Sequence, residues 1–326
     1  GGTSLPSTYP QMDAQLGTCQ TVADEVLAVT LRARMVREAP CIHQRLFIGN
    51  QTGADFNGWI EHEPWFEWTR WQPDWGLIDE RNRAVPCQVL QSEDCFSDAP
   101  RLLFRIRAGR GTCRTLRIVS GLNQSTDPGP CSFDLVSHRG RTLRVKRPGL
   151  SWKVPDLQLH EDRSDTWSHG IDRYRGPLRA KAIWSRARLV DQGPLLCAWC
   201  IDGRIGRSRI AAEIRSYTGE AFIEIRLRVT WLETHRLLRL VWPQAAAILH
   251  RLDGVAGGSL RRASDGAERP VHDRTLLKLE NGARTGVVLP DVFSLSSTRR
   301  ELRLTLLRSA VMAHHAPHDG WPVSYT

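Results

Sequence analysis

The sequence lacks the long apolar runs that membrane-spanning helices require. No uninterrupted apolar stretch approaches about 18 residues, and residues 1–9 carry neither the basic nor the apolar region of a signal peptide. Gly-rich phosphate loops, nucleophile elbows and kinase signatures are also missing, so the sequence contains no complete catalytic set. We therefore expect a soluble chain, located in the cytoplasm, that has no membrane partner.

Lysine is scarce. Only four of the 45 basic residues are Lys, which leaves 41 Arg, and the net charge is +10. The Arg residues are spread along the chain and often alternate with apolar residues, a pattern typical of the polar faces of sheets. An Arg-rich surface for single-stranded nucleic acid is the alternative and would bind with a steep salt dependence. We favour the sheet faces and expect no nucleic-acid partner.

Length and composition are those of a globular protein. The 326 residues are 41% apolar and 25% charged, which is enough for about two domains with sizeable cores. The sequence has no initiator Met, and residues 321–326 follow the last predicted strand without an element of their own. These ends indicate a fragment of a longer protein.

One helix is predicted, over residues 18–37. Val22, Val26 and Val29 lie on one stripe, Thr18 and Thr21 precede it as capping candidates, and Pro40 closes the segment. An apolar stripe of this width needs a partner to cover it, and no later segment repeats the pattern. We expect that partner upstream.

From about residue 44 the apolar period changes to two, which is typical of half-buried strands. The best strand is 222–231, where Ile, Leu and Val alternate with Glu and Arg; further strands are predicted at 103–106, 182–190, 195–201, 237–242 and 302–306. Residues 121–149 are rich in Gly, Pro, Ser and Arg and favour a connection. The predicted fold is mainly β: a helix within 1–40, a small sandwich at 41–120, a connection at 121–149 and a larger β domain at 150–326.

The eight cysteines are interpreted as buried thiols, because a chain of this length without a signal peptide is not a disulfide miniprotein. The only CxxC motif joins Cys197 to Cys200 within a predicted strand. Side chains at i and i+3 of a strand face opposite sides of the sheet, so the pair is not expected to share a metal or a disulfide.

Three polar or aromatic clusters remain as candidates for binding. His314, His315, His318 and Asp319 lack the helical zinc pattern and favour a solvated loop. The Trp cluster suits core packing, carbohydrate stacking or single-stranded nucleic acid, and consists of Trp59, Trp65, Trp68, Trp71 and Trp75. Residues 156–174 combine carboxylates and His with Trp167, which suits either an ordered polar loop or a sugar site.

Several segments, in order, resemble a known family. Ser164 to Tyr174 is similar to the Asp-Thr-Trp-Ser-His-Gly segment of glycoside hydrolase family 38 α-mannosidases, particularly bacterial ones. Gly193–Leu195, Gly206–Arg209 and Arg228–Leu240 resemble strands of that family's C-terminal β region, and so do Arg269–Asp273, Glu280–Ala283 and Leu302–Ser309.

This resemblance implies a retaining α-mannosidase, in which a zinc-dependent catalytic barrel precedes a helical bundle and β-sandwiches. The largest sandwich would resemble the galactose mutarotase supersandwich. The family's two catalytic carboxylates lie in the barrel, so this chain would contain no catalytic residue and would be inactive alone. Implied partners are α-mannoside glycans and the missing N-terminal catalytic domain.

The family's zinc-binding His and sugar-binding Asp precede a Gly-Thr pair at the start of a bundle helix. Counting back from Gly17 and Thr18 places Met12 at the His position and Asp13 at the Asp position. A thioether does not replace imidazole on zinc in an oxygen-rich site. Either this homologue has lost the ligand or the count is out of register, and no zinc is expected in this chain.

The leading hypothesis is the C-terminal part of a family 38 α-mannosidase. Asp13, Asp165, Trp167 and His169 are its predicted substrate contacts. A non-catalytic carbohydrate-binding sandwich that uses the Trp cluster is the alternative.

Overall fold

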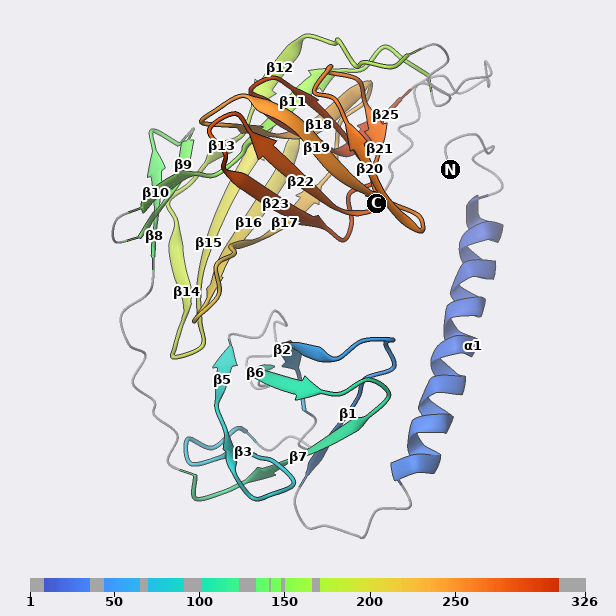
Figure 1. Cartoon of the computed structure of the whole chain (residues 1–326), viewed down its shortest axis with the longest axis vertical. Helices are drawn as coiled ribbons and strands as arrows, with labels where there is room; N and C mark the ends of the chain where they lie inside the picture. The colour runs from blue at the N-terminus through green and yellow to red at the C-terminus, as the bar shows by residue number, and fades with distance from the viewer. Residues whose placement is uncertain are drawn as a thin grey trace.

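The structure is a computed structural model and consists of one long helix and 25 strands in the part of the chain that it describes (Figure 1). The described residues are 9–35, 44–64, 70–90, 101–122, 133–140, 142–147, 150–165 and 171–310. Every strand pair in the described part of the chain, from β1 with β7 to β24 with β25, is antiparallel. The prediction of a mainly β fold with one helix is therefore confirmed.

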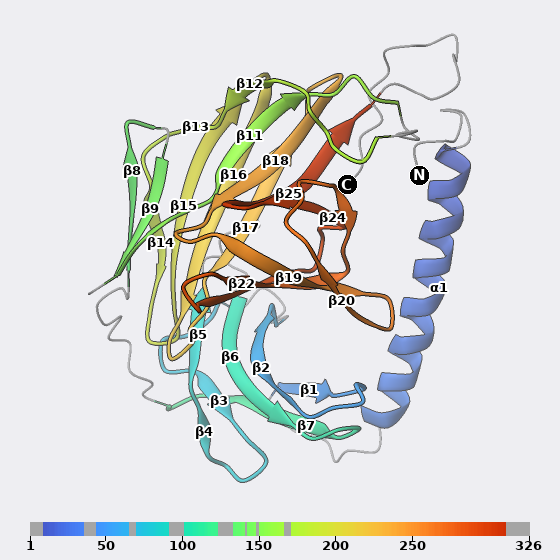
Figure 2. The ribbon, with the colours of Figure 1, turned by 45° about the horizontal axis from the view of Figure 1, so that its top comes forward.

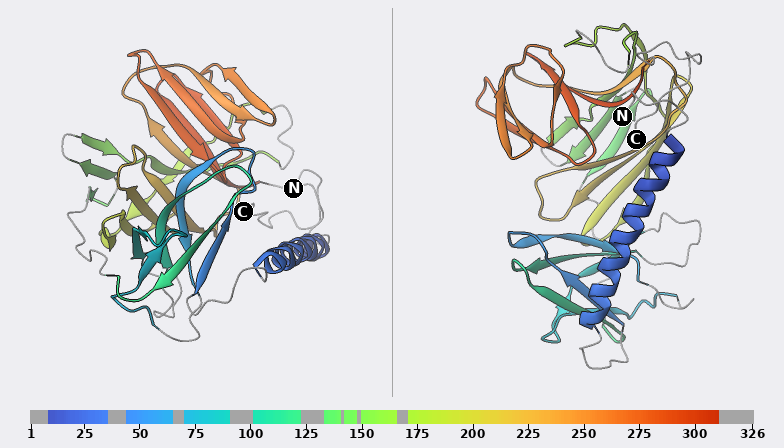
Figure 3. Two further views of the ribbon diagram at one scale, coloured as in Figure 1. Left: turned by 60° about the horizontal axis from the view of Figure 1, so that its bottom comes forward. Right: turned by 90° about the vertical axis from the view of Figure 1, so that its right-hand side faces the viewer.

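Helix α1 (Tyr9–Met35) lies along one side of the molecule (Figure 3). It begins nine residues before the predicted start at 18, so that boundary was wrong. The Thr18 and Thr21 hydroxyls donate to the carbonyls of Ala14 and Gly17, one turn earlier, and thus serve inside the helix rather than as caps. Pro10, in the first turn, suits a helix start.

The apolar stripe of α1 is uncovered in the described part of the chain. The exposed fractions of Val22, Val26 and Val29 are 53%, 62% and 57%. The guanidinium of Arg34 lies 5.8 Å from the centroid of the Phe47 ring, which connects the end of the helix to the first strand. The expectation that the stripe needs a partner remains a prediction.

The first β region encloses its core between two sheets. Leu77, Leu102, Phe104 and Leu116 are fully buried between them. One sheet contains β1 (Arg45–Gly49), β7 (Cys113–Val119), β3 (Gly76–Ile78) and β4 (Ala84–Val85), in that order. The other contains β2 (Phe56–His62), β6 (Arg101–Ala108) and β5 (Cys87–Leu90).

The prediction of a connection at 121–149 was wrong in part, because this range contains strands. A small sheet contains β10 (Leu150–Lys153), β9 (Thr142–Arg147) and β8 (Asp134–His138). Leu135, Leu143 and Val145 are buried against Ile201 and Ile214 of the next sheet. The charged outward side chains between these residues, together with the turn at Gly140, made the composition resemble a loop.

The next sheet contains β13 (Ile183–Trp184), β15 (Leu196–Ile205), β16 (Ser208–Tyr217) and β17 (Glu224–Thr230), with β14 (Arg188–Gln192) also paired to β15. The predicted strand at 182–190 is thus divided in two. In β17 the alternation of Arg226 and Arg228 with Leu227 follows the predicted pattern, because opposite faces of the strand meet different surroundings.

A six-stranded sheet packs with one face against both this sheet and the last one (Figure 2). It contains β12 (Leu178–Lys181), β11 (Asp156–Glu161), β18 (Arg236–Pro243), β25 (Glu301–Ser309), β24 (Ser294–Thr298) and β21 (Arg269–Pro270). Leu157, Leu159 and Leu238 pack against Ile205 and Ile210 of the neighbouring sheet.

The last sheet contains β20 (Gly258–Arg262), β19 (Ile248–Val255), β22 (Asp273–Leu279) and β23 (Arg284–Leu289). Its inner side chains Leu277, Leu279 and Leu289 pack against Leu302 and Leu304 of β25. The remaining predicted strands are confirmed within β6, β15, β18 and β25, each a few residues longer than its apolar core.

Candidate functional site

Two open hollows of about 510 Å³ and about 480 Å³ share the end of β11 and the segment that follows it. Glu161, Asp162 and Arg163 line both. Tyr174 and Arg175 extend the larger hollow, whereas His235 and Arg236, at the start of β18, extend the smaller. The strand pairing β12-β11-β18-β25 brings these segments together.

Glu161 carries two guanidinium partners. Its carboxylate forms ion pairs with Arg163 and Arg179, and the Glu161 side chain is only 10% exposed. The hydrogen bonds from Arg179 and Arg163 hold the pKa of Glu161 below its usual range. Gly176 permits this close packing, because a Cβ at that position would lie 1.7 Å from the Glu161 carbonyl oxygen.

Asp162 is held by an arginine from the last strand. Arg308 Nε donates to Asp162 Oδ2 at 2.6 Å, and the Asp162 side chain is 2% exposed. The same guanidinium donates to the Ser164 hydroxyl and to the Asp165 carbonyl oxygen. Arg308 thereby fixes the backbone of residues 162–165 although it lies 146 residues from Asp162 in sequence.

Tyr174 lines the larger hollow and lies against two arginines. The guanidinium carbons of Arg308 and Arg239 lie 4.9 Å and 5.6 Å from the centroid of its ring. Arg239 is 2% exposed and pairs with Glu268 at 2.9 Å. Burial lowers the pKa of Arg239, and the charge of Glu268 opposes that effect. The hollow therefore has an aromatic wall in a fixed position.

The predicted sugar contacts fall in different places. Asp165 lies beside this site, where its backbone carbonyl accepts a hydrogen bond from Arg308. Asp13 is exposed on α1. Trp167 and His169 lie outside the described residues. Arg308 was missed, since no local pattern joins a strand arginine to a carboxylate that distant in sequence, whereas Asp162 and Tyr174 were recognised only as members of the polar segment 156–174.

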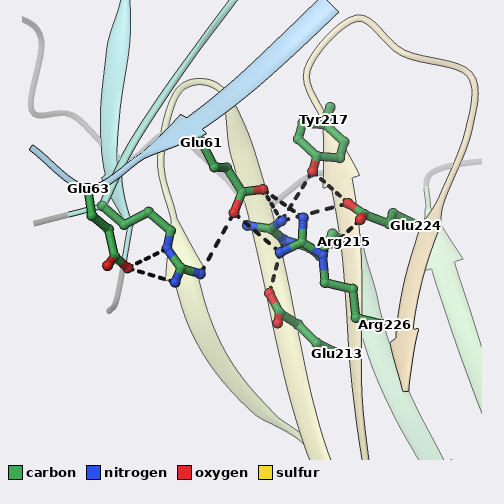
Figure 4. Close-up of polar contacts among 8 residues, drawn as sticks. Glu61, Glu63, Glu213, Arg215, Tyr217, Glu224 and Arg226 are labelled. Carbon is green, nitrogen blue, oxygen red and sulfur yellow. Dashed lines mark hydrogen bonds and ion pairs between the residues drawn. The ribbon is translucent and has the colours of Figure 1, made fainter. Parts of the chain in front are cut away.

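A second charged cluster joins the first β region to the sheet of β15, β16 and β17 (Figure 4). Arg215 is 2% exposed and forms ion pairs with Glu61 and Glu213. Glu61 also accepts from Arg226 at 2.7 Å. Burial raises the pKa of Glu61, but the hydrogen bonds and charges of Arg226 and Arg215 outweigh it, and the pKa lies below its usual range.

Apolar contacts enclose this cluster. Leu90, Leu103, Leu196 and Ala198 are buried beside it, and the Gln88 side chain accepts from the backbone N–H groups of Leu195 and Leu196 at 2.9 and 2.8 Å. Every charged group shown in Figure 4 has an oppositely charged partner. The cluster therefore holds two β regions together and leaves no unpaired charge for a ligand.

The described members of the Trp cluster pack inside the protein. Trp59 contacts Tyr217, with ring centroids 5.3 Å apart, and donates to Glu220 at 3.2 Å. Trp71 and Trp75 meet edge to face at 5.7 Å against the core of the first β region. These contacts favour the core-packing interpretation over a carbohydrate platform; Trp65 and Trp68 lie outside the described residues.

The cysteine prediction was wrong for two residues. Cys197 is disulfide-bonded, and Cys19 is an exposed thiol. Cys87, Cys113 and Cys200 are partly buried thiols, and burial raises the pKa of the Cys200 thiol. Cys197 and Cys200 do not bond to each other, as predicted. His314, His315, His318 and Asp319 lie outside the described residues.

The described residues do not fit a zinc ion. No group of three or more His, Cys, Asp or Glu side chains among them is arranged to hold a metal. Met12 and Asp13 lie inside α1 rather than before it, and Met12 offers only a thioether. No helix in the described part of the chain is long and apolar enough to cross a bilayer.

The model of the "Glycosyl hydrolases family 38 C-terminal domain" matches residues 143–316, more than half of the chain. The chain belongs to glycosyl hydrolase family 38. The matched residues run from β9 to beyond β25 and include the whole candidate site. The resemblance of the segments around Ser164, Arg228 and Leu302 is thereby confirmed at the level of the family.

Two solved structures have a fold similar to that of this chain. An α-mannosidase from Enterococcus faecalis V583 matches with a TM-score of 0.65 and 10% identity, over 94% of this chain and 45% of its own. A family 38 protein from Enterococcus faecalis matches with a TM-score of 0.62 and 9% identity, over 94% and 46%. A search of curated proteins found no match. The chain thus spans less than half the length of these two structures.

Proposed function

We propose that this chain is the C-terminal, β-rich part of an α-mannosidase-like glycoside hydrolase that removes terminal α-mannosides. The family match over residues 143–316 carries the proposal. The chain would support a zinc-dependent catalytic barrel in the complete, cytoplasmic enzyme. The proposed division remains 41–120 and 150–326 for the two β domains, with residues 133–147 added to the second because they pack against its core.

The charged groups of the site support a binding role rather than a catalytic one. A retaining glycosidase needs one carboxylate as nucleophile and a second group that is protonated near neutral pH as general acid. Glu161 is paired with two arginines that lower its pKa, so it stays ionised. The Asp162 carboxylate accepts hydrogen bonds from the Arg308 guanidinium and from the backbone N–H of Ser164. Neither residue is suited to donate a proton to a leaving group.

The hollow offers what a bound glycan requires at its periphery. Carboxylate oxygens accept hydrogen bonds from sugar hydroxyls, guanidinium groups donate to sugar oxygens, and an aromatic wall contacts the apolar face of a pyranose. Asp165, beside the hollow, is the proposed first contact, together with Trp167 and His169, which follow it in sequence. Asp13 is proposed as a separate contact on α1.

The test is the affinity of the chain for an α-linked mannobiose, measured by Trp fluorescence. We expect saturable binding, and Asp165→Asn should weaken it about 10-fold, since a hydrogen bond to a charged group contributes about 1.5 kcal/mol. Asp202→Asn is the matched control, because Asp202 is exposed on β15 and pairs with Arg188. The same affinity in Asp165→Asn and Asp202→Asn, or no saturable signal, would contradict the assignment.

A further inference from the structure

The outer face of the last sheet combines apolar and basic side chains without acidic ones. The strands of this sheet form an outer layer, orange to red in Figure 3. Across them, Arg261, Leu252, Leu276 and Gly286 face one another in register. The exposed fractions of Leu252 and Leu276 are 39% and 41%, whereas their neighbours Arg251 and Thr275 point inward and are buried.

The adjacent rows of the same face are basic. His250 pairs with Lys278, which pairs with Arg284, on one side of the apolar row. On the other side, Arg274 pairs with Val288, whose exposed fraction is 80%. We call the set His250, Leu252, Arg261, Arg274, Leu276, Lys278, Arg284, Gly286 and Val288 the outer face.

Apart from Arg274, the cations of the outer face have no acidic partner on these four strands. The acidic residues of these four strands are Asp253 and Asp273. Asp253 is fully buried on the inner side, and Asp273 pairs only with its neighbour Arg274 at the sheet margin. Lys278, Arg284 and Arg261 form no ion pair with any residue that the structure describes. Such a surface attracts negative charge.

His250 lies among the positive charges of the outer face, and its pKa is shifted accordingly. Burial lowers the pKa of His250, and the charges of Arg261 and Lys278 lower it further. Arg261 Nη2 lies 3.3 Å from His250 Nδ1. The charged groups that face His250 from both neighbouring strands are therefore cations.

The chemistry of the outer face selects among anionic partners. It has no aromatic side chain, so it lacks the stacking platform that sugars and nucleic-acid bases use. Its apolar side chains lie on the strands of a sheet rather than on a protruding loop or amphipathic helix that would enter a bilayer. A row of aliphatic side chains beside the cations Lys278, Arg284 and Arg261 is complementary to a polypeptide that carries aliphatic and acidic side chains.

We propose that the outer face docks a polypeptide partner whose aliphatic side chains are flanked by carboxylates. The aliphatic side chains cover Leu252, Leu276 and Val288, and the carboxylates meet Lys278, Arg284 and Arg261. This role is independent of glycan binding, because the candidate site lies on a different sheet, at the end of β11.

The test uses the complete chain and a fluorescein-labelled 12-residue peptide of alternating Leu and Glu, followed by anisotropy. Saturable binding is expected, and it should weaken as salt rises from 50 to 500 mM, since screening shortens the range of the charges. The double variant Lys278→Glu/Arg284→Glu should weaken binding at least about 10-fold. The control Arg110→Glu/Arg186→Glu makes the same change of net charge on exposed residues elsewhere and should stay within about 2-fold.

Two further arms separate charge from apolar contact. The variant Leu252→Ser/Leu276→Ser should also weaken binding, and a peptide of alternating Ser and Glu should bind far more weakly than the Leu-Glu peptide. Equal losses in both charge-reversal variants, equal binding of both peptides, or binding only to anionic vesicles or heparin would overturn the proposal. Thermal midpoints of all variants would show that each remains folded.

Discussion

The two faces of the β20-β19-β22-β23 sheet both carry basic side chains, which are buried on the inner face and exposed on the outer face. On the inner face, Arg251 and Asp253 have no exposed surface, and Arg251 Nε lies 2.9 Å from Asp253 Oδ2. On the outer face, Lys278 and Arg284 are exposed and form no ion pair within the described chain. Arginine and lysine of one small sheet therefore serve internal structure on one side and offer charge to solvent on the other.

This difference revises what the Arg excess means. Solvated sheet faces were predicted, and the outer face and Arg228 agree with that prediction. Arg215, Arg239 and Arg251 do not, because each is buried with carboxylate partners. A guanidinium suits this role, since it remains charged and donates hydrogen bonds in several directions.

The largest effect on stability is expected at the pair of Arg251 and Asp253, which has no exposed surface. Arg251→Met should destabilise the chain by about 3–5 kcal/mol, because it removes the buried partner of Asp253 and leaves only the more distant Arg262, at 3.6 Å, to balance that carboxylate. Urea unfolding measures the change. The double variant Arg251→Met/Asp253→Leu should recover most of the loss, and failure to recover would mean that packing rather than charge dominates.

The charged cluster of Glu61, Arg215 and Arg226, which joins the two β regions, should also lose stability when one partner is removed. This loss should be smaller and should depend on pH. Glu61→Gln should lower the free energy of unfolding by about 1–2 kcal/mol near pH 7. The loss is limited because Arg215 still pairs with Glu213 and Arg226 still pairs with Glu224. The folded-state pKa of Glu61 lies below its ordinary value of 4.5. Its contribution is therefore complete above about pH 5 and is lost as the pH falls through the lower, folded value.

Urea unfolding of the native chain and Glu61→Gln between pH 7 and pH 3 tests this sign. The difference between the two should shrink toward acid. A difference that stays constant, or that grows as the pH falls, would show that the carboxylate of Glu61 is not the group that matters. Asp202→Gln, an exposed site on β15, serves as the control.

The smallest effect is expected on the outer face. Lys278→Glu/Arg284→Glu should change the free energy of unfolding by less than about 0.5 kcal/mol, because exposed side chains without partners contribute little. Differential scanning calorimetry of this variant beside Arg251→Met measures the contrast directly. A large loss of stability would mean that the outer face serves the fold itself.

The sequence predicted those parts of the fold that depend on local period. The alternation in β17 gave its position because each strand face has one kind of environment. The start of α1 was predicted wrongly, because Thr18 and Thr21 were interpreted as caps. Their hydroxyls instead donate to backbone carbonyls one turn earlier within the helix. Strands β8 and β9 were missed because their outward side chains are those of loops.

The candidate site was predicted only in outline. The polar segment after β11 was recognised from composition, and it does border a hollow. Its geometry depends on Arg308, 146 residues from Asp162, and the junction depends on Arg215, 154 residues from Glu61. Pairings across such separations are set by sheet topology, which the period of a single strand does not contain.

The most direct test of the proposed function is hydrolysis of an aryl α-mannoside by the chain alone, with and without added zinc. We predict no turnover in either case, since the Glu161 and Asp162 carboxylates of the candidate site are paired with arginines and the described residues do not fit a zinc ion. Turnover that a chelator abolishes would contradict the claim that the catalytic groups lie elsewhere in the complete enzyme.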